Sequence, residues 1–320
     1  MTADHKDGGR RHLLSADDLD LEAIERILEA ARGFEEVAQR ELKKLPTLRG
    51  RTVVSAFFES STRTSSSFEL AAKRLSADVM SIRGSGSAVD KGESLKDTVL
   101  TLDQYGPDVL VMRHPQIGAP ALATRYTRAA VVNAGDGKHQ HPTQGLLDLY
   151  TIREALGTCD GIHVAIVGDV LHSRVARSDI ALLVRCGAHV SLVGPPTLVP
   201  RGIEAMGVSV SHDIASIADA DVVYVLRMQR ERMLEGEAYV PSLREYAARY
   251  GVTAARVRPG QLVMHPGPMN RGVEIAGDVA DGAQSLIERQ VRAGLVVRMA
   301  VLYDLLAEPS LVRERAGVAA

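Results

Sequence analysis

The chain has 320 residues, 45% of them hydrophobic and 24% charged, a globular balance that excludes a disordered or fibrous protein. This length exceeds the usual domain size of about 100–150 residues, so we expect two domains. The 38 basic and 40 acidic side chains nearly cancel and Trp is absent, which argues against nucleic acid or a membrane surface as a partner.

The first dozen residues are polar, and residues 1–12 are predicted to form a mobile tail. They lack the apolar region of a signal peptide, and no run approaches the roughly 18 apolar residues of a membrane span. Two cysteines, Cys159 and Cys186, are too few for a disulfide scaffold. We therefore expect a protein of the reducing cytoplasm.

A long amphipathic helix is predicted after the tail. Ser15 followed by Asp18 is typical of an N-cap with an acidic first turn. Apolar residues then recur at helical spacing, at Leu21, Ile24, Leu28, Ala31 and Phe34. This spacing predicts one helix that begins directly after Ser15.

Short apolar runs rich in β-branched residues then alternate with helical segments. The first runs span residues 52–58, 77–82, 108–113 and 130–134. After a predicted helix at 143–156, further runs span 163–169, 189–194, 208–213, 221–227 and 261–267. Strands that are apolar on both faces are typical of parallel sheets covered by helices. The sequence therefore predicts an α/β fold of two doubly wound parallel-sheet domains joined by interdomain helices, with a last helical stretch at about 283–307 that returns to the first domain.

The segment FFESSTRTSSSFELA, residues 57–71, carries the strongest local signal. A strand ends there and a helix begins at Ser61, Thr62, Arg63 and Thr64. Hydroxyl groups, a guanidinium and the free N–H groups of a helix start together indicate a phosphate site. The alternative is an ordinary helix cap rich in Ser and Thr. A Walker A pattern is missing, so we do not expect a nucleoside triphosphate.

Three more arginines lie at the carboxyl ends of predicted strands. Arg113 and Arg227 are the last residues of their strands, and Arg174 follows its strand at the start of a helix. Ligands of open α/β sheets bind beyond the carboxyl ends of the strands, where Arg63 also lies. One such arginine alone is ordinary surface. Four of them indicate a small substrate, or a pair of substrates, with a phosphate and more than one carboxylate.

The segment GDGKHQHPTQGLLDL, residues 135–149, places His141 and Gln144 at another helix start. His139 and His141 lack a nearby third ligand, so we expect no metal. His141 could donate to a developing oxyanion and Gln144 could bind a neutral amide, with a structural cap as the alternative.

Two further loops carry functional signals. The Gly- and Ser-rich segment 83–94, which contains Lys91, is either plain surface or a lid. The turn MHPGPMNRG, residues 264–272, could offer backbone carbonyls to an amide. The chain lacks G-x-S-x-G, H-E-x-x-H and the three-glycine dinucleotide motif, which disfavours a serine hydrolase, a zinc protease and a dehydrogenase.

In order and spacing, these motifs resemble the catalytic chains of the aspartate carbamoyltransferase family over about residues 50–275. The motifs are FFESSTRTSSSFE, KGES, VMRHPQ, HPTQ, VGDVLHSR, LRMQRER and HPGPMNRGVEI. The related ornithine carbamoyltransferases share the STRT and HPTQ elements but usually have cysteine at the position of Pro266. The resemblance implies transfer of the carbamoyl group of carbamoyl phosphate to the α-amine of L-aspartate, giving N-carbamoyl-L-aspartate and phosphate, an early step of pyrimidine biosynthesis without a cofactor.

The resemblance also implies domains and residue roles. The carbamoyl phosphate-binding domain would comprise residues 13–142 plus 283–320, and the aspartate-binding domain residues 143–282. Carbamoyl phosphate would be bound by Ser61, Thr62, Arg63, Thr64, Ser87, Arg113, His141, Gln144, Pro266, Gly267 and Pro268. Aspartate would be bound by Lys91, Arg174, Arg227 and Gln229. The catalytic residues would be Arg63, Thr64, Arg113 and His141.

In this family the loop carrying Ser87 and Lys91 comes from a neighbouring subunit, so the resemblance implies a homotrimer with shared sites. A regulatory chain or another pyrimidine enzyme stays open as a partner. Gly267 departs from the leucine of some relatives. Two rivals also stay open: a catalytically silent paralogue, disfavoured by the intact motifs, and a nicotinamide dehydrogenase.

Overall fold

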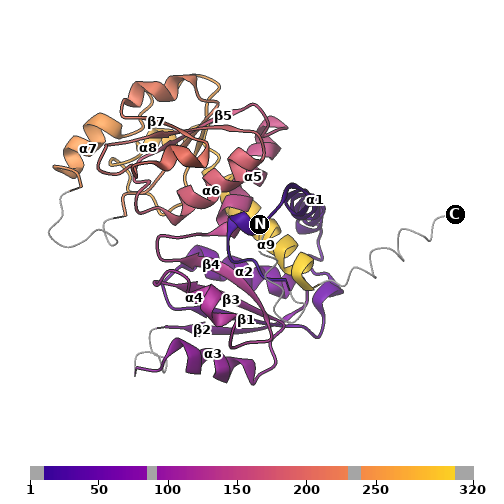
Figure 1. Ribbon diagram of the computed structural model, residues 1–320. Coiled ribbons are helices and arrows are strands. Elements are labelled where there is room, and N and C mark those ends of the chain that lie inside the picture. The colour runs from indigo at the N-terminus through magenta and orange to yellow at the C-terminus, as the bar shows by residue number, and fades with distance from the viewer. Residues whose placement is uncertain (1–10, 85–91, 230–238, 307–320) are drawn as a thin grey trace. The chain divides into compact units, whose positions relative to one another are not determined.

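The computed structural model describes residues 11–84, 92–229 and 239–306 (Figure 1). The chain divides into two compact units, Met1–Gly137 with Gly294–Ala320, and Lys138–Ala293. Each unit holds one parallel sheet with helices around it, which confirms the predicted fold class. Within the described ranges, no helix is long and apolar enough to cross a membrane.

The first long helix begins later than predicted. Ser15 caps only a short 3-10 turn, η1 (Ala16–Asp18), where it accepts the N–H of Asp17. Leu19 is extended, and helix α1 (Leu21–Ala38) has its own cap in Asp20, whose carboxylate accepts the N–H of Ala23 at 2.7 Å. The prediction that Ser15 starts the long helix was wrong, because a capping box fits any first turn and cannot tell a 3-10 turn from an α-helix.

The first unit contains a four-stranded sheet in the order β2-β1-β3-β4. Its strands are β1 (Thr52–Phe57), β2 (Asp78–Arg83), β3 (Val109–His114) and β4 (Ala130–Asp136). Its short and long helices after α1 are η2 (Pro46–Leu48), α2 (Thr62–Arg74), α3 (Leu95–Asp103) and α4 (Ala119–Ala123). Strands β1, β3 and β4 are mostly buried, but β2 is the exposed edge strand, contrary to the prediction of strands covered on both faces.

The chain changes direction across this sheet next to β1. It moves outward from β1 through α2 to β2, then returns through α3 to β3 and on through α4 to β4. Because such crossovers are right-handed, α2 covers one face while α3 and α4 cover the other (Figure 1). On the α3 and α4 face, Val54, Leu110 and Met112 pack against Val99 and Leu102. The switch in direction leaves a crevice position between the carboxyl ends of β1 and β3.

The second unit repeats this design with a five-stranded sheet in the order β7-β6-β5-β8-β9. Its strands are β5 (His163–Val167), β6 (His189–Val193), β7 (Ser209–Ser211), β8 (Val222–Val225) and β9 (Leu262–Met264). Its helices are α5 (Pro142–Leu156), α6 (Arg174–Arg185), η4 (Ile203–Met206), η5 (Ile214–Asp219), α7 (Leu243–Tyr250) and α8 (Gly277–Ala280). Here the switch lies between β5 and β8.

Helix α9 (Ile287–Leu306) begins in the second unit and carries the chain back into the first. Near its end, the carboxylate of Asp304 accepts from Arg26 Nε at 2.6 Å and from Arg11 Nη1 at 3.2 Å. These ion pairs tie the end of α9 to α1 and to the chain before η1.

Helices α5 and α6 approach each other closely at Gly145. A Cβ atom at this position would lie 2.9 Å from Leu182 Cδ1 and 3.1 Å from the carbonyl carbon of Ser178. The N–H of His141 donates to Ser178 Oγ at 2.8 Å. The start of α5 is thereby fixed against α6.

Candidate active site

In the first unit, the predicted phosphate-binding residues form the start of α2. Ser61 is its N-cap and accepts the N–H of Thr64 at 3.3 Å. Thr62 and Arg63 are exposed, whereas Thr64 is buried. The first turn of a helix leaves backbone N–H groups without helical acceptors, so this segment offers both hydroxyl and N–H donors to an anion.

Arg113 lies on the neighbouring strand β3, directly opposite Phe57 of β1 in the sheet register. Its side chain is 12% exposed, and Nη2 donates to Glu59 Oε1 at 2.7 Å. Because Glu59 follows β1, the ion pair holds the Arg113 guanidinium beside the chain that leads into α2. Sequence reasoning missed Glu59, although it lies within the same motif as the phosphate-binding residues.

In the second unit, Arg174 is the first residue of α6, after the N-cap Ser173. It is only 2% exposed. A cation at the positive end of a helix is electrostatically unfavourable, and burial of a charge adds to this cost. A carboxylate beside the guanidinium would interact favourably with it in this buried position.

Arg227 and Gln229 follow β8, the strand beside β5. Arg227 Nη2 donates to Gln229 Oε1 at 3.1 Å, and this leaves the Gln229 amide nitrogen as a donor on the other side. The backbone N–H of Gln229 donates to Asp169 Oδ2 at 3.1 Å. The segments after β5 and β8 are therefore linked directly at the switch point.

Asp169 is the centre of that link, and sequence reasoning did not single it out. It is fully buried, and its Oδ1 lies 2.8 Å from Nδ1 of His172. The His172 ring in turn packs edge-on against Tyr239, with ring centroids 4.7 Å apart. This arrangement fixes the loop that leads to Arg174.

His141 and Gln144 lie where the sequence predicted, at the start of α5. His141 is the N-cap residue, Pro142 is the first helical residue, and both His141 and Gln144 are buried. Gln144 Nε2 lies 3.2 Å from Oδ1 and 3.1 Å from Oδ2 of Asp148, one turn further along the helix.

The turn after β9 contains Pro266, Gly267 and Pro268. The N–H of Gly267 donates to His265 Nδ1 at 2.8 Å, and His265 Nε2 lies 3.4 Å from Glu274 Oε1. Gly267 has a φ of +62° and precedes a cis proline. The left-handed backbone at this position explains why glycine is suitable here.

The structure thus brings the predicted residues together in two sets, one in each unit. The first set lies after β1 and at the carboxyl end of β3, and it comprises Ser61, Thr62, Arg63, Thr64 and Arg113. The second set belongs to the sheet and helices of the second unit and comprises His141, Gln144, Arg174, Arg227, Gln229, Pro266, Gly267 and Pro268. Ser87 and Lys91 lie outside the described residues.

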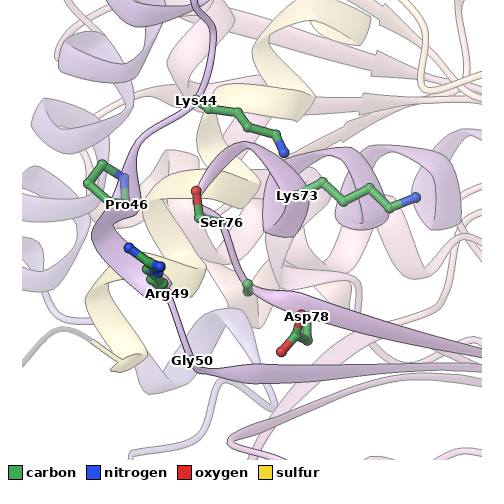
Figure 2. A pocket seen from close by; sticks show the side chains of 8 residues that line it. Lys44, Pro46, Arg49, Gly50, Lys73, Ser76 and Asp78 are labelled. Carbon is green, nitrogen blue, oxygen red and sulfur yellow. The ribbon is translucent and has the colours of Figure 1, made fainter.

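Two further features were considered as alternative sites: a group of metal ligands and a cavity in the first unit. In the described part of the chain, no three His, Cys, Asp or Glu side chains group as metal ligands would. A cavity of about 620 Å³ is lined by Lys44, Arg49 and Lys73 among others (Figure 2). It lies beside Gly50 and Asp78, at the amino ends of β1 and β2, opposite to the edge where ligands of such sheets bind.

Two family models match this chain. The carbamoyl-P binding domain of aspartate/ornithine carbamoyltransferases matches residues 11–154, and their Asp/Orn binding domain matches residues 160–305. The chain belongs to the aspartate/ornithine carbamoyltransferase family. The resemblance inferred from the motifs is therefore confirmed.

Individual members of this family are similar over most of their length. The aspartate carbamoyltransferase catalytic subunit of Acidothermus cellulolyticus is 55% identical, over 97% of both chains. That of Salinispora arenicola is 56% identical, over 92% of this chain and 98% of its own. The crystal structure of aspartate transcarbamoylase from Trypanosoma cruzi with carbamoyl aspartate and phosphate has a TM-score of 0.84 at 35% identity, over 93% of this chain and 96% of its own.

Proposed function

We propose that this chain catalyses carbamoyl transfer from carbamoyl phosphate to the α-amine of L-aspartate, with N-carbamoyl-L-aspartate and phosphate as products. One observation carries the proposal: arginines lie at or after the carboxyl ends of the strands that flank the switch point in both sheets, namely β1 and β3 in the first sheet and β5 and β8 in the second. The names of the relatives, which are aspartate carbamoyltransferase catalytic subunits, support the choice of reaction.

The first set of residues would bind the phosphate end of the donor. Ser61, Thr62, Arg63 and Thr64 supply hydroxyl, N–H and guanidinium donors at the start of α2. Arg113, which donates to Glu59, would bridge the phosphate and the carbonyl oxygen.

Residues of the second unit would bind the carbamoyl group. His141 would join Thr64 and Arg113 in donating to the carbonyl oxygen. The amide oxygen of Gln144 and the backbone carbonyls of Pro266, Gly267 and Pro268 would accept from the carbamoyl NH₂ group. These contacts would distinguish a carbamoyl group from a simple acyl group, which has no N–H to donate.

The acceptor would be held by its two carboxylates. Arg174 would bind the α-carboxylate, and Arg227 with Gln229 and Lys91 would bind the β-carboxylate. Two guanidinium groups on neighbouring segments suit a dicarboxylate, whereas the side-chain ammonium of ornithine would be repelled by Arg227. This charge pattern favours aspartate over ornithine.

The reaction needs positioning and oxyanion stabilisation more than acid or base catalysis. The unprotonated α-amine of aspartate attacks the carbamoyl carbon, and a C–N bond forms while the carbonyl oxygen gains negative charge. The C–O bond to phosphate then breaks, and the departing phosphate takes the proton that the amine loses. Thr64, Arg113 and His141 would stabilise the oxyanion as preorganised donors.

The assembly is part of the proposal. We infer a cytoplasmic homotrimer in which the loop carrying Ser87 and Lys91 completes the site of a neighbouring subunit. Whether a regulatory chain or another pyrimidine enzyme also binds is decided by copurification of the native protein.

An acceptor competition tests the proposed function. The purified chain is given carbamoyl phosphate with equal concentrations of aspartate and ornithine, and both carbamoylated products are quantified. We expect carbamoyl aspartate in at least about 100-fold excess, because the side-chain ammonium of ornithine would place a positive charge beside the Arg227 guanidinium. An excess of citrulline would make the chain an ornithine carbamoyltransferase, and the absence of both products would make it a silent paralogue.

Two variants sharpen this assay. Arg227→Gln should raise the KM for aspartate at least about tenfold by removing a charge-assisted pair. Arg201→Gln, which alters an exposed arginine away from the strand ends, is the matched control and should leave both kinetic constants unchanged.

A further inference from the structure

A buried carboxylate lies behind Gln144 in the second unit. Asp148 of α5 is 1% exposed and receives donors from three elements. Gln144 Nε2 contacts both of its oxygens, Gln290 Nε2 of α9 donates to Oδ1 at 2.7 Å, and the hydroxyl of Tyr224 on β8 donates to Oδ2 at 2.7 Å. The contacts of this group thus reach well beyond its own helix.

The carboxylate determines how the Gln144 amide is turned. An ionised carboxylate only accepts hydrogen bonds, so the NH₂ group of Gln144 must face Asp148. The Gln144 oxygen is then directed to the other side, where it can accept. An acceptor is what the NH₂ group of a carbamoyl donor requires.

The same carboxylate reaches the turn after β9. Gln290 donates to Asp148 and accepts the backbone N–H of His265 on its Oε1 at 2.9 Å. His265 in turn accepts the N–H of Gly267 on Nδ1 at 2.8 Å. Three consecutive hydrogen bonds therefore connect Asp148 with the backbone whose carbonyls are proposed to bind the carbamoyl amide.

We propose that Asp148 is a positioning residue for recognition of the carbamoyl amide, because its carboxylate orients Gln144 directly and the 266–268 turn through Gln290. The inference rests on the proposed function, since the roles of Gln144 and of the turn belong to it. A merely structural network would contribute to folding alone and would not change the affinity of the folded protein for carbamoyl phosphate.

The protonation states in this cluster are compatible with the role. Burial raises the pKa of Asp148 to about 6, so this carboxyl is mostly ionised at neutral pH. Burial and the neighbouring Asp148 raise the pKa of Asp179, on α6, well above its ordinary value. The hydrogen bond between the two carboxyl groups raises the pKa of Asp179 and lowers that of Asp148, which favours Asp148 as the acceptor.

A double-mutant cycle tests the role of Asp148. Carbamoyl phosphate is titrated without aspartate into the wild-type chain, Asp148→Asn, Gln144→Ala and the double variant, and the Kd values are compared. We expect Asp148→Asn to weaken binding about tenfold in the wild-type background, the value of one lost oriented hydrogen bond. In the Gln144→Ala background, the factor by which Asp148→Asn raises the Kd should be at least about three times smaller than in the wild-type background. Equal factors in the two backgrounds would overturn the proposal.

Tyr224→Phe is the control for loss of a hydrogen bond within the cluster, because it removes a donor to the same carboxylate and leaves the bonds of Asp148 with Gln144 and Gln290 in place. It should leave the Kd for carbamoyl phosphate within about twofold of wild type, although it lowers stability. A loss of affinity as large as that of Asp148→Asn would reduce the cluster to a structural role and overturn the proposal. If Asp148→Asn does not fold, Gln290→Met replaces it, with a loss of carbamoyl phosphate affinity expected and an unchanged Kd contradicting the inference.

These outcomes separate the inference from the proposed function. A wild-type chain that binds carbamoyl phosphate but does not carbamoylate aspartate refutes the proposed acceptor, and the cycle still decides the role of Asp148. A wild-type chain that does not bind carbamoyl phosphate overturns both.

Discussion

Glu59, Asp148 and Asp169 have a common task, which is to hold a neighbouring side chain or backbone segment in place. Glu59 pairs with Arg113, Asp148 with Gln144, and Asp169 with the backbone of Gln229. Glu59 and Asp169 each act across neighbouring strands, over 54 and 60 residues of sequence. Local motifs indicate where an arginine follows a strand, but they cannot reveal a partner that the sheet order brings close. The position of the arginines at the strand ends was therefore predictable from the sequence, whereas the residues that hold the neighbouring groups in place were not.

His141→Ala should lower turnover by about 10²–10³, the usual loss when one oxyanion donor is removed. The KM for aspartate should change little, and the circular dichroism spectrum should remain that of the wild type. His139→Ala, which alters an exposed histidine two positions away, is the control and should retain nearly full activity. Equal losses in the two variants would remove His141 from its proposed role.

Carbamoyl phosphate binding should weaken as the pH falls through about 6. The reason is that Asp148, whose pKa burial raises to about 6, then takes up a proton and no longer fixes the Gln144 amide in one orientation. The titratable groups next to it are Asp179 of α6 and Tyr224 of β8, whose pKa values are raised by burial and by the neighbouring Asp148. Calorimetric titrations from pH 5 to 8 should show this loss of carbamoyl phosphate affinity at low pH in the wild type and not in Asp148→Asn. Identical profiles for both chains, after the common protonation of the ligand cancels, would contradict it.

At the scale of elements, the strands were predicted to within a few residues because runs of β-branched residues are a local signal. The exposure of β2 was not, because whether a strand is central or at an edge depends on the sheet order. The same limit applies to the cap of α1, where Ser15 and Asp20 both offer suitable side chains and only the structure distinguishes the turn from the helix. Local sequence thus predicted where the strands lie, but it did not predict which strand is exposed at the edge or which residue caps α1.

The close contact of α5 with α6 gives an element-scale prediction. Gly145→Ala should lower the free energy of unfolding by about 1–3 kcal/mol, since the added methyl group would overlap Leu182 and Ser178. Gly33→Ala in α1 is the matched control, because nothing lies within 4 Å of its Cβ position. That change should raise stability by about 0.5–1 kcal/mol through helix propensity alone. Denaturant titrations of both variants measure the difference, and an unaffected Gly145→Ala chain would contradict the close packing.

At the scale of the whole molecule, each unit has predicted arginines at the strands where its strand order reverses. The sequence predicted the two parallel sheets, but the orders β2-β1-β3-β4 and β7-β6-β5-β8-β9 arise from long-range pairing that no local pattern specifies. In the first sheet this order puts the carboxyl ends of β1 and β3 side by side, and in the second sheet it does the same for β5 and β8. The substrate assigned to each domain remains a prediction, as do the roles of Ser87 and Lys91.

The shared site predicts complementation between inactive chains. Arg63→Ala and Lys91→Ala chains, mixed and reassembled, should recover up to about a quarter of wild-type activity, because in a cyclic trimer that fraction of sites receives both intact residues. Each variant reassembled with itself is the control and should stay inactive. Mixed trimers without activity would show that the site does not draw on two subunits.

The proposed reaction requires the predicted arginines of both units to bind one pair of substrates. N-(phosphonacetyl)-L-aspartate, which the Trypanosoma cruzi relative binds, carries a phosphonate and an aspartate in one molecule and so reports on both sets at once. Titration calorimetry should give one bound molecule per wild-type chain. Arg63→Ala and Arg227→Gln should each weaken its binding at least about tenfold. Wild-type affinity in either variant would contradict the claim that both sets bind the same ligand.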